Sequence, residues 1–207
     1  MTRLYAGIAA AAVAAVLGAL GVVVLMRGQD EAFAQCRATN VAGGTAAIGG
    51  PFELVDQTGR TVTDADVFTK PALVYFGYTF CPDVCPLDSA RNAEAVDLLE
   101  EMGYEVTPVF ISVDPQRDTP EVLADYAELF HPRMIALTGS PEQVQAASQA
   151  YRTYYRIHES DDEFYLVDHS TFTYLVLPEV GFVEFFRRES SAEEMAEATS
   201  CFLRAAS

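Results

Sequence analysis

Beyond Pro51 the chain alternates short apolar runs with longer stretches in which apolar residues recur at helical spacing. The clearest run, Ala72–Tyr78, is apolar throughout, as expected for a strand that is buried on both faces of a sheet. Before it, the turn-forming sequence Asp56-Gln57-Thr58-Gly59 predicts a β-hairpin. The predicted strands are Phe52–Val55, Arg60–Val62, Ala72–Tyr78, Val106–Val113, Ile135–Leu137, Phe172–Leu177 and Val183–Phe186.

Helices are predicted between these strands and after the last one. Pro86–Met102 carries spaced apolar positions that are typical of a helix packed on a sheet. Three further helices are predicted from capping sequences at their starts, namely Thr119-Pro120-Glu121, Ser140-Pro141-Glu142-Gln143 and Ser191-Ala192-Glu193-Glu194. Alternating strands and helices predict a parallel core, and the closing strand–turn–strand–helix adds an antiparallel edge. The order predicts an α/β, thioredoxin-like fold, which by itself assigns no chemistry.

The N-terminal part of the chain predicts a transmembrane helix. Leu4–Met26 contains no charged residue, and a helix of this length would reach ~35 Å, enough for a ~30 Å hydrocarbon layer. A secretory signal has a shorter apolar region, so an uncleaved anchor is favoured over cleavage after Ala32-Phe33-Ala34. The chain is therefore expected to divide into a membrane anchor (residues 1–27), a flexible linker (28–50) and one domain (51–207).

The charge of the chain excludes one class of partner. There are 13 basic and 30 acidic residues, which give a formal net charge of −17 at pH 7. Such a surface repels nucleic-acid phosphates, and it attracts cationic partners or metal ions. All the acidic residues follow Met26, whereas Arg3 precedes the apolar run. This asymmetry favours a short cytoplasmic tail and a domain on the outer face of the membrane.

Two of the four cysteines form the strongest chemical signal. Cys81 and Cys85 lie in Cys81-Pro82-Asp83-Val84-Cys85-Pro86, between the apolar strand and the start of the next helix. A spacing of four places both side chains on one helical face, where they can share a metal ion or form a disulfide. A helix N-terminus also lowers the pKa of a thiol. Two small buried hydrophobic residues would be the alternative reading, which the turn residues between them disfavour.

A third metal ligand has to come from a distant part of the chain, because the first histidine after this pair is His131. His131 ends a predicted helix and is expected to be structural or exposed. His158 lies in an acidic segment and is expected to be solvated. His169 differs, since it lies in a short polar interruption just before the strand Phe172–Leu177. A single histidine is more often structural than a ligand, so residue chemistry alone leaves the role of His169 open.

Three motifs in collinear order carry a resemblance to a known family: Gly77-Tyr78-Thr79-Phe80-Cys81-Pro82-Asp83-Val84-Cys85-Pro86, Ser112-Val113-Asp114-Pro115-Gln116-Arg117-Asp118-Thr119-Pro120, and Val167-Asp168-His169-Ser170 with Tyr174-Leu175. The chain resembles the Sco/SenC family of thioredoxin-fold copper chaperones for cytochrome c oxidase over roughly residues 48–203. The resemblance implies that Cys81, Cys85 and His169 are copper ligands. Asp114, Arg117 and Asp118 match a family motif, which we interpret as supporting the loop that carries the site.

Two functions are compatible with these residues. The first is a copper chaperone that metallates the dinuclear copper centre of cytochrome c oxidase, with the copper-bearing oxidase subunit and an upstream copper donor as partners. The second is a thiol–disulfide oxidoreductase that keeps the oxidase cysteines reduced. His169 and the three residues between Cys81 and Cys85 favour copper delivery, because reductases of the thioredoxin type use Cys-x-x-Cys and need no histidine. The resemblance implies a location in the periplasm, or in the mitochondrial intermembrane space of a eukaryote.

The two remaining cysteines, Cys36 and Cys201, lie outside the family motifs. In an oxidising compartment two such cysteines tend to pair. A disulfide between them is therefore predicted, which would join the segment after the anchor to the last helix.

Overall fold

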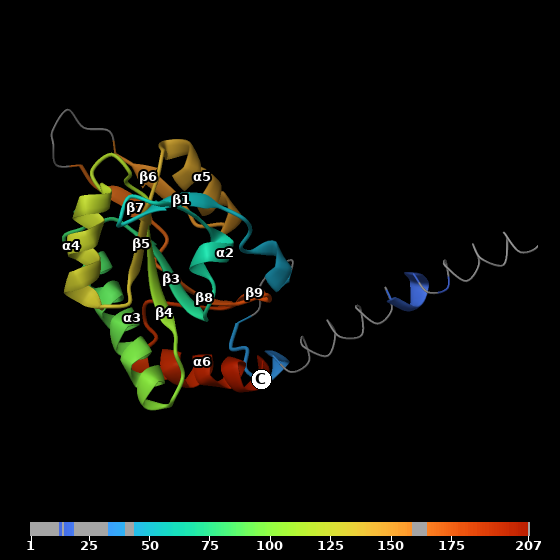
Figure 1. Ribbon diagram of the computed structural model, residues 1–207. Coiled ribbons are helices and arrows are strands. Elements are labelled where there is room, and N and C mark those ends of the chain that lie inside the picture. Colours follow the sequence, from blue (N-terminus) through green and yellow to red (C-terminus); the bar gives the residue numbers. More distant parts are fainter. Residues whose placement is uncertain (1–12, 14, 19–32, 40–43, 159–164, 207) are drawn as a thin grey trace, which may run out of the picture.

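The computed structural model describes residues 13, 15–18, 33–39, 44–158 and 165–206. A central sheet of seven strands has the order β2-β1-β5-β4-β3-β8-β9, and β6 pairs with β7 in a separate small sheet (Figure 1). The strands are β1 Glu53–Asp56, β2 Thr61–Thr63, β3 Ala72–Gly77, β4 Thr107–Ser112, β5 Ile135–Thr138, β6 Tyr155–Ile157, β7 Val167–His169, β8 Thr173–Leu177 and β9 Gly181–Phe186.

The middle of the large sheet is parallel and its flanks are antiparallel, as the sequence predicts. Strand β3 pairs in parallel with β4, and β4 with β5, whereas β1 and β8 run antiparallel to their neighbours β5 and β3. Every residue of β3 is buried, because strands and helices surround it on all sides. The mixed sheet confirms the predicted α/β architecture, and the carboxyl end of β3 leads directly into the segment with Cys81.

The helices are α2 Asp64–Val67, α3 Val84–Glu101, α4 Pro120–Phe130, α5 Pro141–Ala150 and α6 Ala192–Ala206, with a short 3-10 helix η1 at Thr45–Ala47. The predicted caps are present: Thr119 caps α4, and Ser140 forms a capping box with Gln143 at the start of α5. Ser191 likewise exchanges hydrogen bonds with Glu194 at the start of α6. These caps satisfy backbone N–H groups that have no partner inside the helix.

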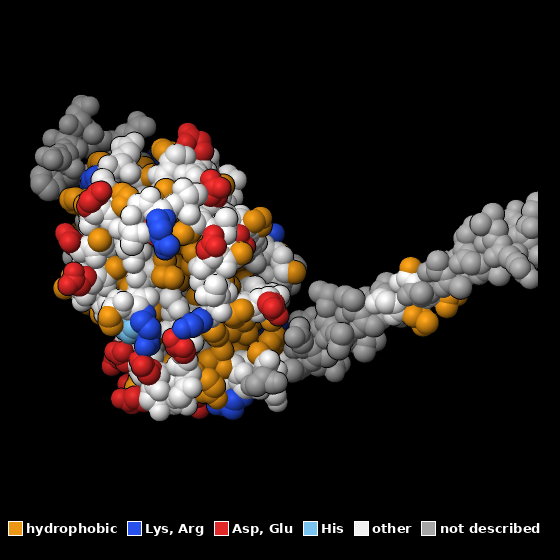
Figure 2. Space-filling model, viewed as in Figure 1, with side chains coloured by type: hydrophobic (Ala, Val, Ile, Leu, Met, Phe, Trp, Pro, Cys, Tyr) orange, Lys and Arg blue, Asp and Glu red, His pale blue; other side chains and the backbone are white. Residues whose placement is uncertain are grey.

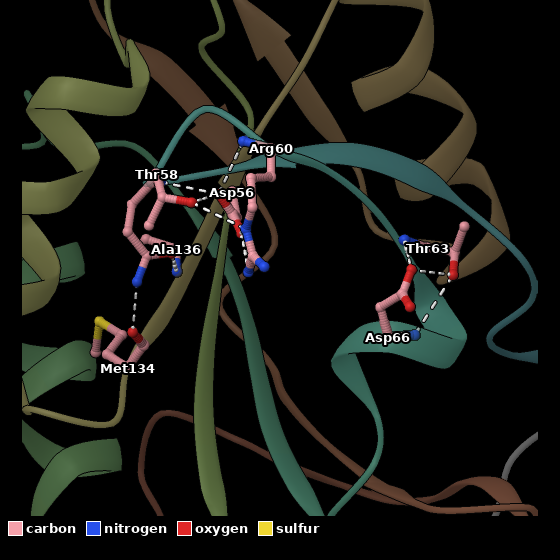
Figure 3. Close-up of polar contacts among 8 residues, drawn as sticks. Asp56, Thr58, Arg60, Thr63, Asp66, Met134 and Ala136 are labelled. Atoms are coloured by element: carbon pink, nitrogen blue, oxygen red, sulfur yellow. Dashed lines mark hydrogen bonds and ion pairs between the residues drawn. The ribbon is translucent and has the colours of Figure 1, made fainter.

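The predicted hairpin β1–β2 is held by its turn residues (Figure 3). The Asp56 carboxylate accepts hydrogen bonds from the backbone N–H groups of Thr58 and Arg60 and forms an ion pair with the Arg60 guanidinium at 2.8 Å. Gln57 joins the hairpin to the segment leading into β5, since its amide donates to the Met134 carbonyl and accepts from Ala136 N–H. Nearby, Thr63 and Asp66 form the capping box of α2.

The hairpin β6–β7 is absent from the predicted elements. Each of its strands has three residues, too few to show the alternation of polar and apolar positions by which a strand is recognised. Tyr155 pairs with His169 in this small sheet. His169 therefore ends a strand, and the polar interruption in the sequence marks an extended segment of its own.

The segment 33–39 packs against the domain. Cys36 and Cys201 form the predicted disulfide, with a Cα–Cα distance of 5.7 Å, and the buried Phe33 ring contacts Phe202. The predicted anchor, Leu4–Met26, lies largely outside the described residues. Among the residues that the structure describes, no helix is long and apolar enough to cross a membrane.

Candidate metal centre

Cys81 and Cys85 lie where the buried strand β3 gives way to α3. Cys81 is in the connecting loop, and Cys85 lies in the first turn of the helix. The backbone N–H of Cys85 donates to Cys81 Sγ at 3.4 Å, and the two sulfur atoms lie within 4.8 Å of each other. Cys85 is fully buried and Cys81 is 6% exposed. Both are free thiols, and their placement agrees with the spacing argument from the sequence.

His169 reaches these thiols from the end of β7. Its Nε2 lies 3.2 Å from Cys85 Sγ, and one donor atom from each of Cys81, Cys85 and His169 lies within 4.8 Å of the others. The Nδ1 atom lies 3.0 Å from the Ser170 carbonyl, to which Nδ1–H can donate. That hydrogen bond selects the tautomer in which the Nε2 lone pair faces the thiols, the arrangement that an imidazole ligand needs.

The two thiols have different acidities. The side-chain hydrogen bond with Cys85 lowers the pKa of Cys81, while burial opposes it. The same hydrogen bond, together with burial, raises the pKa of Cys85. Cys81 is therefore the more readily ionised thiol of the pair, and Cys85 would have to lose its proton to bind a metal ion.

Aromatic rings surround the imidazole. The Tyr75 and Tyr78 rings meet the His169 ring edge to face, with centroids 6.0 and 5.7 Å away. Tyr75 is itself held by a hydrogen bond from its hydroxyl to Asp88 at 2.9 Å, and burial raises the pKa of that carboxyl. Both tyrosine rings therefore pack against the imidazole of His169.

The motif around Asp114 contacts the loop before Cys81. Asp118 is fully buried and accepts hydrogen bonds from the backbone N–H and the hydroxyl of Thr79. Arg117 forms an ion pair with Asp114 and lies over the rings of Tyr78 and Phe80. These contacts agree with the interpretation that Asp114, Arg117 and Asp118 support this loop.

The other two histidines lie elsewhere. His131 is buried at the end of α4, where Nδ1 accepts from Arg133 N–H at 3.0 Å. His158 is exposed and pairs with Asp168 at 2.7 Å. Within the described part of the chain, the group of metal-binding side chains that forms consists of the three predicted residues.

Sequence reasoning missed Tyr75, whose ring packs against His169, and Tyr165, whose hydroxyl donates to Asp114 and whose ring lies against Arg117. Tyr75 is hidden in the apolar run of β3, where an aromatic residue is expected for core packing alone. Tyr165 precedes the unpredicted strand β7, and the motif around His169 begins only at Val167. The sequence does offer a signal that Tyr78 lies near the centre, because Tyr78 directly precedes the loop with Cys81.

Two thiols and one imidazole form a soft, low-coordinate donor set. Such a set suits Cu(I) and can hold Cu(II), whereas a structural zinc site requires a fourth protein ligand. The mixed sheet and the three clustered donors thus define an α/β protein of thioredoxin-like architecture with a candidate centre for a soft metal ion.

Comparisons with known proteins identify the family. The family model of SCO1/SenC matches residues 40–204. Protein SenC of Rhodobacter capsulatus is 55% identical over 197 residues, which are 95% of this chain and 89% of SenC. The chain belongs to the SCO1/SenC family.

More distant relatives agree with this assignment. The mitochondrial Protein SCO1 homolog 1 of Arabidopsis thaliana is 44% identical over 74% of this chain, which spans only 46% of that longer protein. The crystal structure of Arabidopsis thaliana ScoI with copper bound has 43% identity and a TM-score of 0.73, covering 76% of this chain and 99% of that chain. The fold seen here is therefore the one that a copper-bound relative adopts.

Proposed function

We propose that this protein is a copper chaperone that binds copper through Cys81, Cys85 and His169 and delivers it to the dinuclear copper centre of cytochrome c oxidase. The observation that carries the proposal is the convergence of three donor atoms within 4.8 Å, with the imidazole tautomer selected by Ser170. The copper-bound state of a related structure and the membership of the SCO1/SenC family support copper as the ion.

Three protein ligands suit delivery better than storage. Copper with three donors leaves room for an incoming thiolate from a partner, so transfer proceeds by ligand exchange without release of the free ion. Cys81 is 6% exposed and Cys85 is fully buried, so a partner's ligand would approach the metal from the side of Cys81. An acidic surface, with a net charge of −17 for the whole chain, attracts a cationic donor or acceptor.

The proposal includes partners and a location. The copper-bearing subunit of cytochrome c oxidase receives the ion, and an upstream copper donor supplies it. Leu4–Met26 anchors the chain in the membrane, with the domain in the periplasm, or in the intermembrane space of mitochondria. The burial of Phe33 supports an uncleaved chain, because cleavage after Ala34 would remove a ring from the core.

A second candidate function is thiol–disulfide exchange at the same site. It is supported by the different acidities of the two thiols, which resemble those of an attacking thiolate, Cys81, and a buried resolving thiol, Cys85. Exchange between thiols and a disulfide does not require His169. This residue therefore separates the two functions.

The test compares His169→Ala with Cys81→Ser, Cys85→Ser and the control His158→Ala, which removes an exposed imidazole outside the cluster. For copper delivery we expect His169→Ala to retain Cu(I) on two thiolates and to lose ~10–100-fold or more in Cu(II) affinity. Each serine variant is expected to lose Cu(I). The measurements are copper affinity in vitro and assembly of the dinuclear centre in cells.

The cellular result decides between the two functions. Loss of oxidase activity in cells with His169→Ala, partly restored by added copper, agrees with delivery. Wild-type oxidase activity in that variant would show that the thiols alone suffice, and the chaperone proposal would then be wrong.

A further inference from the structure

Arg117 lies in an aromatic cage beside the metal centre. Its side chain is 12% exposed and enters from the loop between β4 and α4. The guanidinium carbon lies 3.5 Å from the centroid of the Tyr165 ring, 4.9 Å from that of Phe80 and 5.7 Å from that of Tyr78. A planar cation can stack on several rings at once, and the attraction is strongest where water is excluded.

A buried carboxylate completes the cage. Asp114, which is fully buried, forms an ion pair with the Arg117 Nε. Its other oxygen, Oδ1, accepts a hydrogen bond from the Tyr165 hydroxyl at 2.6 Å. Arg117 and Asp114 therefore hold Tyr165 at two points, by the ring face and by the hydroxyl group.

The rings of the cage come from the two arms of the metal centre. Tyr78 and Phe80 lead into Cys81, whereas Tyr165 leads into β7, which ends at His169. Cys85 and His169 come from elements that are far apart in the sequence, and the small sheet β6–β7 is not paired with the large sheet. The cage spans the two arms, beside the packing of Tyr75 and Tyr78 against His169, and so bears on the distance between Nε2 of His169 and the thiols.

From this geometry we infer that Arg117 is a positioning residue that holds the His169-bearing hairpin β6–β7 against the Cys81 loop. The inference rests on the proposed function in one respect, that His169 is a copper ligand. Its structural content, a link between Arg117 and the hairpin, does not depend on copper. Lysine in place of Arg117 keeps the charge but loses the planar group that stacks on Tyr165 and the Nε–H that donates to Asp114.

The first experiment is independent of the metal. Amide hydrogen exchange is measured on the metal-free full-length protein in detergent for wild type, Arg117→Lys and the control Arg133→Lys, whose partly exposed side chain pairs with Glu100 away from the cage. In Arg117→Lys we expect the amides of Tyr155–Ile157 and Val167–His169 to exchange about tenfold faster than in wild type, or more. In the control, these amides should exchange at the wild-type rate. Wild-type exchange in the hairpin of Arg117→Lys would overturn the inference.

The second experiment is a double-mutant cycle with Cu(II) as the probe. If Arg117 acts through His169, Arg117→Lys and His169→Ala each weaken Cu(II) binding by ~10–100-fold, and the double variant is no weaker than His169→Ala. Nitrogen hyperfine coupling from the imidazole in the copper electron paramagnetic resonance spectrum is expected to weaken in Arg117→Lys. A double variant whose loss is the product of the two single losses would overturn the inference.

The two experiments separate the inference from the proposed function. A wild-type protein that binds no copper would contradict the proposed function, and hydrogen exchange would still decide whether Arg117 holds the hairpin. Hydrogen exchange in the hairpin could be faster while the double variant loses Cu(II) affinity by the product of the two single losses. Arg117 would then stabilise the hairpin without positioning His169, and this outcome also counts against the inference.

Discussion

At the scale of single residues, the position of Cys85 depends on the space that Gly77 leaves. A Cβ atom on Gly77 would lie 2.8 Å from Tyr75 Cε1, 3.0 Å from Phe110 Cε2 and 3.1 Å from Cys85 Sγ. All three neighbours are buried, so none can move into solvent to make room. Gly77 thus serves the metal centre without contributing a ligand, since its missing side chain lets a ring and a sulfur atom approach the backbone.

We predict that Gly77→Ala damages both stability and metal binding. Overpacking a buried site costs about 1–3 kcal/mol, and the displaced Cys85 sulfur lies farther from His169, so Cu(I) affinity should fall ~10-fold or more. Chemical denaturation and copper competition measure the two effects. Gly50→Ala is the control, because its added Cβ would be 3.5 Å from Ala150, an ordinary contact. Unchanged copper affinity in Gly77→Ala would contradict the argument.

At the scale of elements, the sequence predicts those parts whose signals are local. The helix starts at Thr119, Ser140 and Ser191 were predicted correctly because a cap and its partner lie within three residues. The hairpin β6–β7 escaped prediction because each of its strands has only three residues, too few to show a periodic pattern. The family resemblance identified His169 as a metal ligand, whereas the chemistry of a single histidine left its role open.

The supporting residues of the site show the same limit. Asp118 and Thr79 lie far apart in the chain and meet only through parallel pairing of β3 and β4. The contact between Arg117 and Tyr165 likewise depends on where the unpredicted hairpin docks. Such contacts follow from tertiary packing, so neither periodicity nor capping sequences could indicate them.

The hairpin β1–β2 gives a prediction about pH. Burial opposes ionisation of Asp56, but hydrogen bonds from Thr58 and Arg60 outweigh it and lower the pKa of this carboxyl below 3.8. A lowered folded-state pKa stabilises the protein above the unfolded value, and this contribution is lost as the pH falls through the folded value. Asp56→Asn should therefore cost about 1 kcal/mol at pH 7.

Denaturation of wild type and Asp56→Asn between pH 7 and strongly acidic pH tests this sign. The difference in free energy of unfolding should be constant well above pH 3.8 and shrink below that value. Asp66→Asn is a comparison at an exposed cap of α2, where Thr63 similarly lowers the pKa of the carboxyl. A difference for Asp56→Asn that does not change with pH would mean that its charge is unimportant.

At the scale of the whole molecule, the buried residues form two clusters, one that contains the metal centre and one that holds the N-terminal segment. One cluster includes Cys81, Cys85, Tyr75 and the inner faces of α4 and α5. The other joins α3 and α6 and contains Phe33, with Cys36 packed against it. Figure 1 shows α6 at one end of the molecule and the hairpin β6–β7 at the other. Figure 2 shows acidic side chains spread over the visible face, as expected from the excess of acidic residues.

The N-terminal segment is attached to the second cluster by several bonds. The disulfide joins Cys36 to α6, and the buried Glu184 carboxylate on β9 accepts hydrogen bonds from the N–H groups of Ala38 and Thr39. Phe33 fills the space beside Phe202. The point at which the chain leaves the domain is thereby fixed at the α6 end, remote from the centre with Cys81, Cys85 and His169.

This separation predicts that the disulfide contributes to stability and leaves the metal centre unaffected. Cys36 and Cys201 are 165 residues apart, and closing so large a loop stabilises by about 5 kcal/mol in the chain-entropy account. We expect Cys36→Ser/Cys201→Ser to lower the midpoint of chemical denaturation clearly. Its Cu(I) stoichiometry and affinity should equal those of wild type, because Cys81 and Cys85 belong to the other cluster.

The measurement is denaturation of the metal-free full-length protein beside copper titration of the native protein, with the single variant Cys201→Ser to separate loss of the bond from loss of a particular side chain. If the bond is responsible, the single and double variants lose similar stability, because either one breaks it. Copper affinity that falls in step with stability would show that the two clusters are coupled. The N-terminal attachment would then help to shape the metal centre, contrary to the division of the molecule described above.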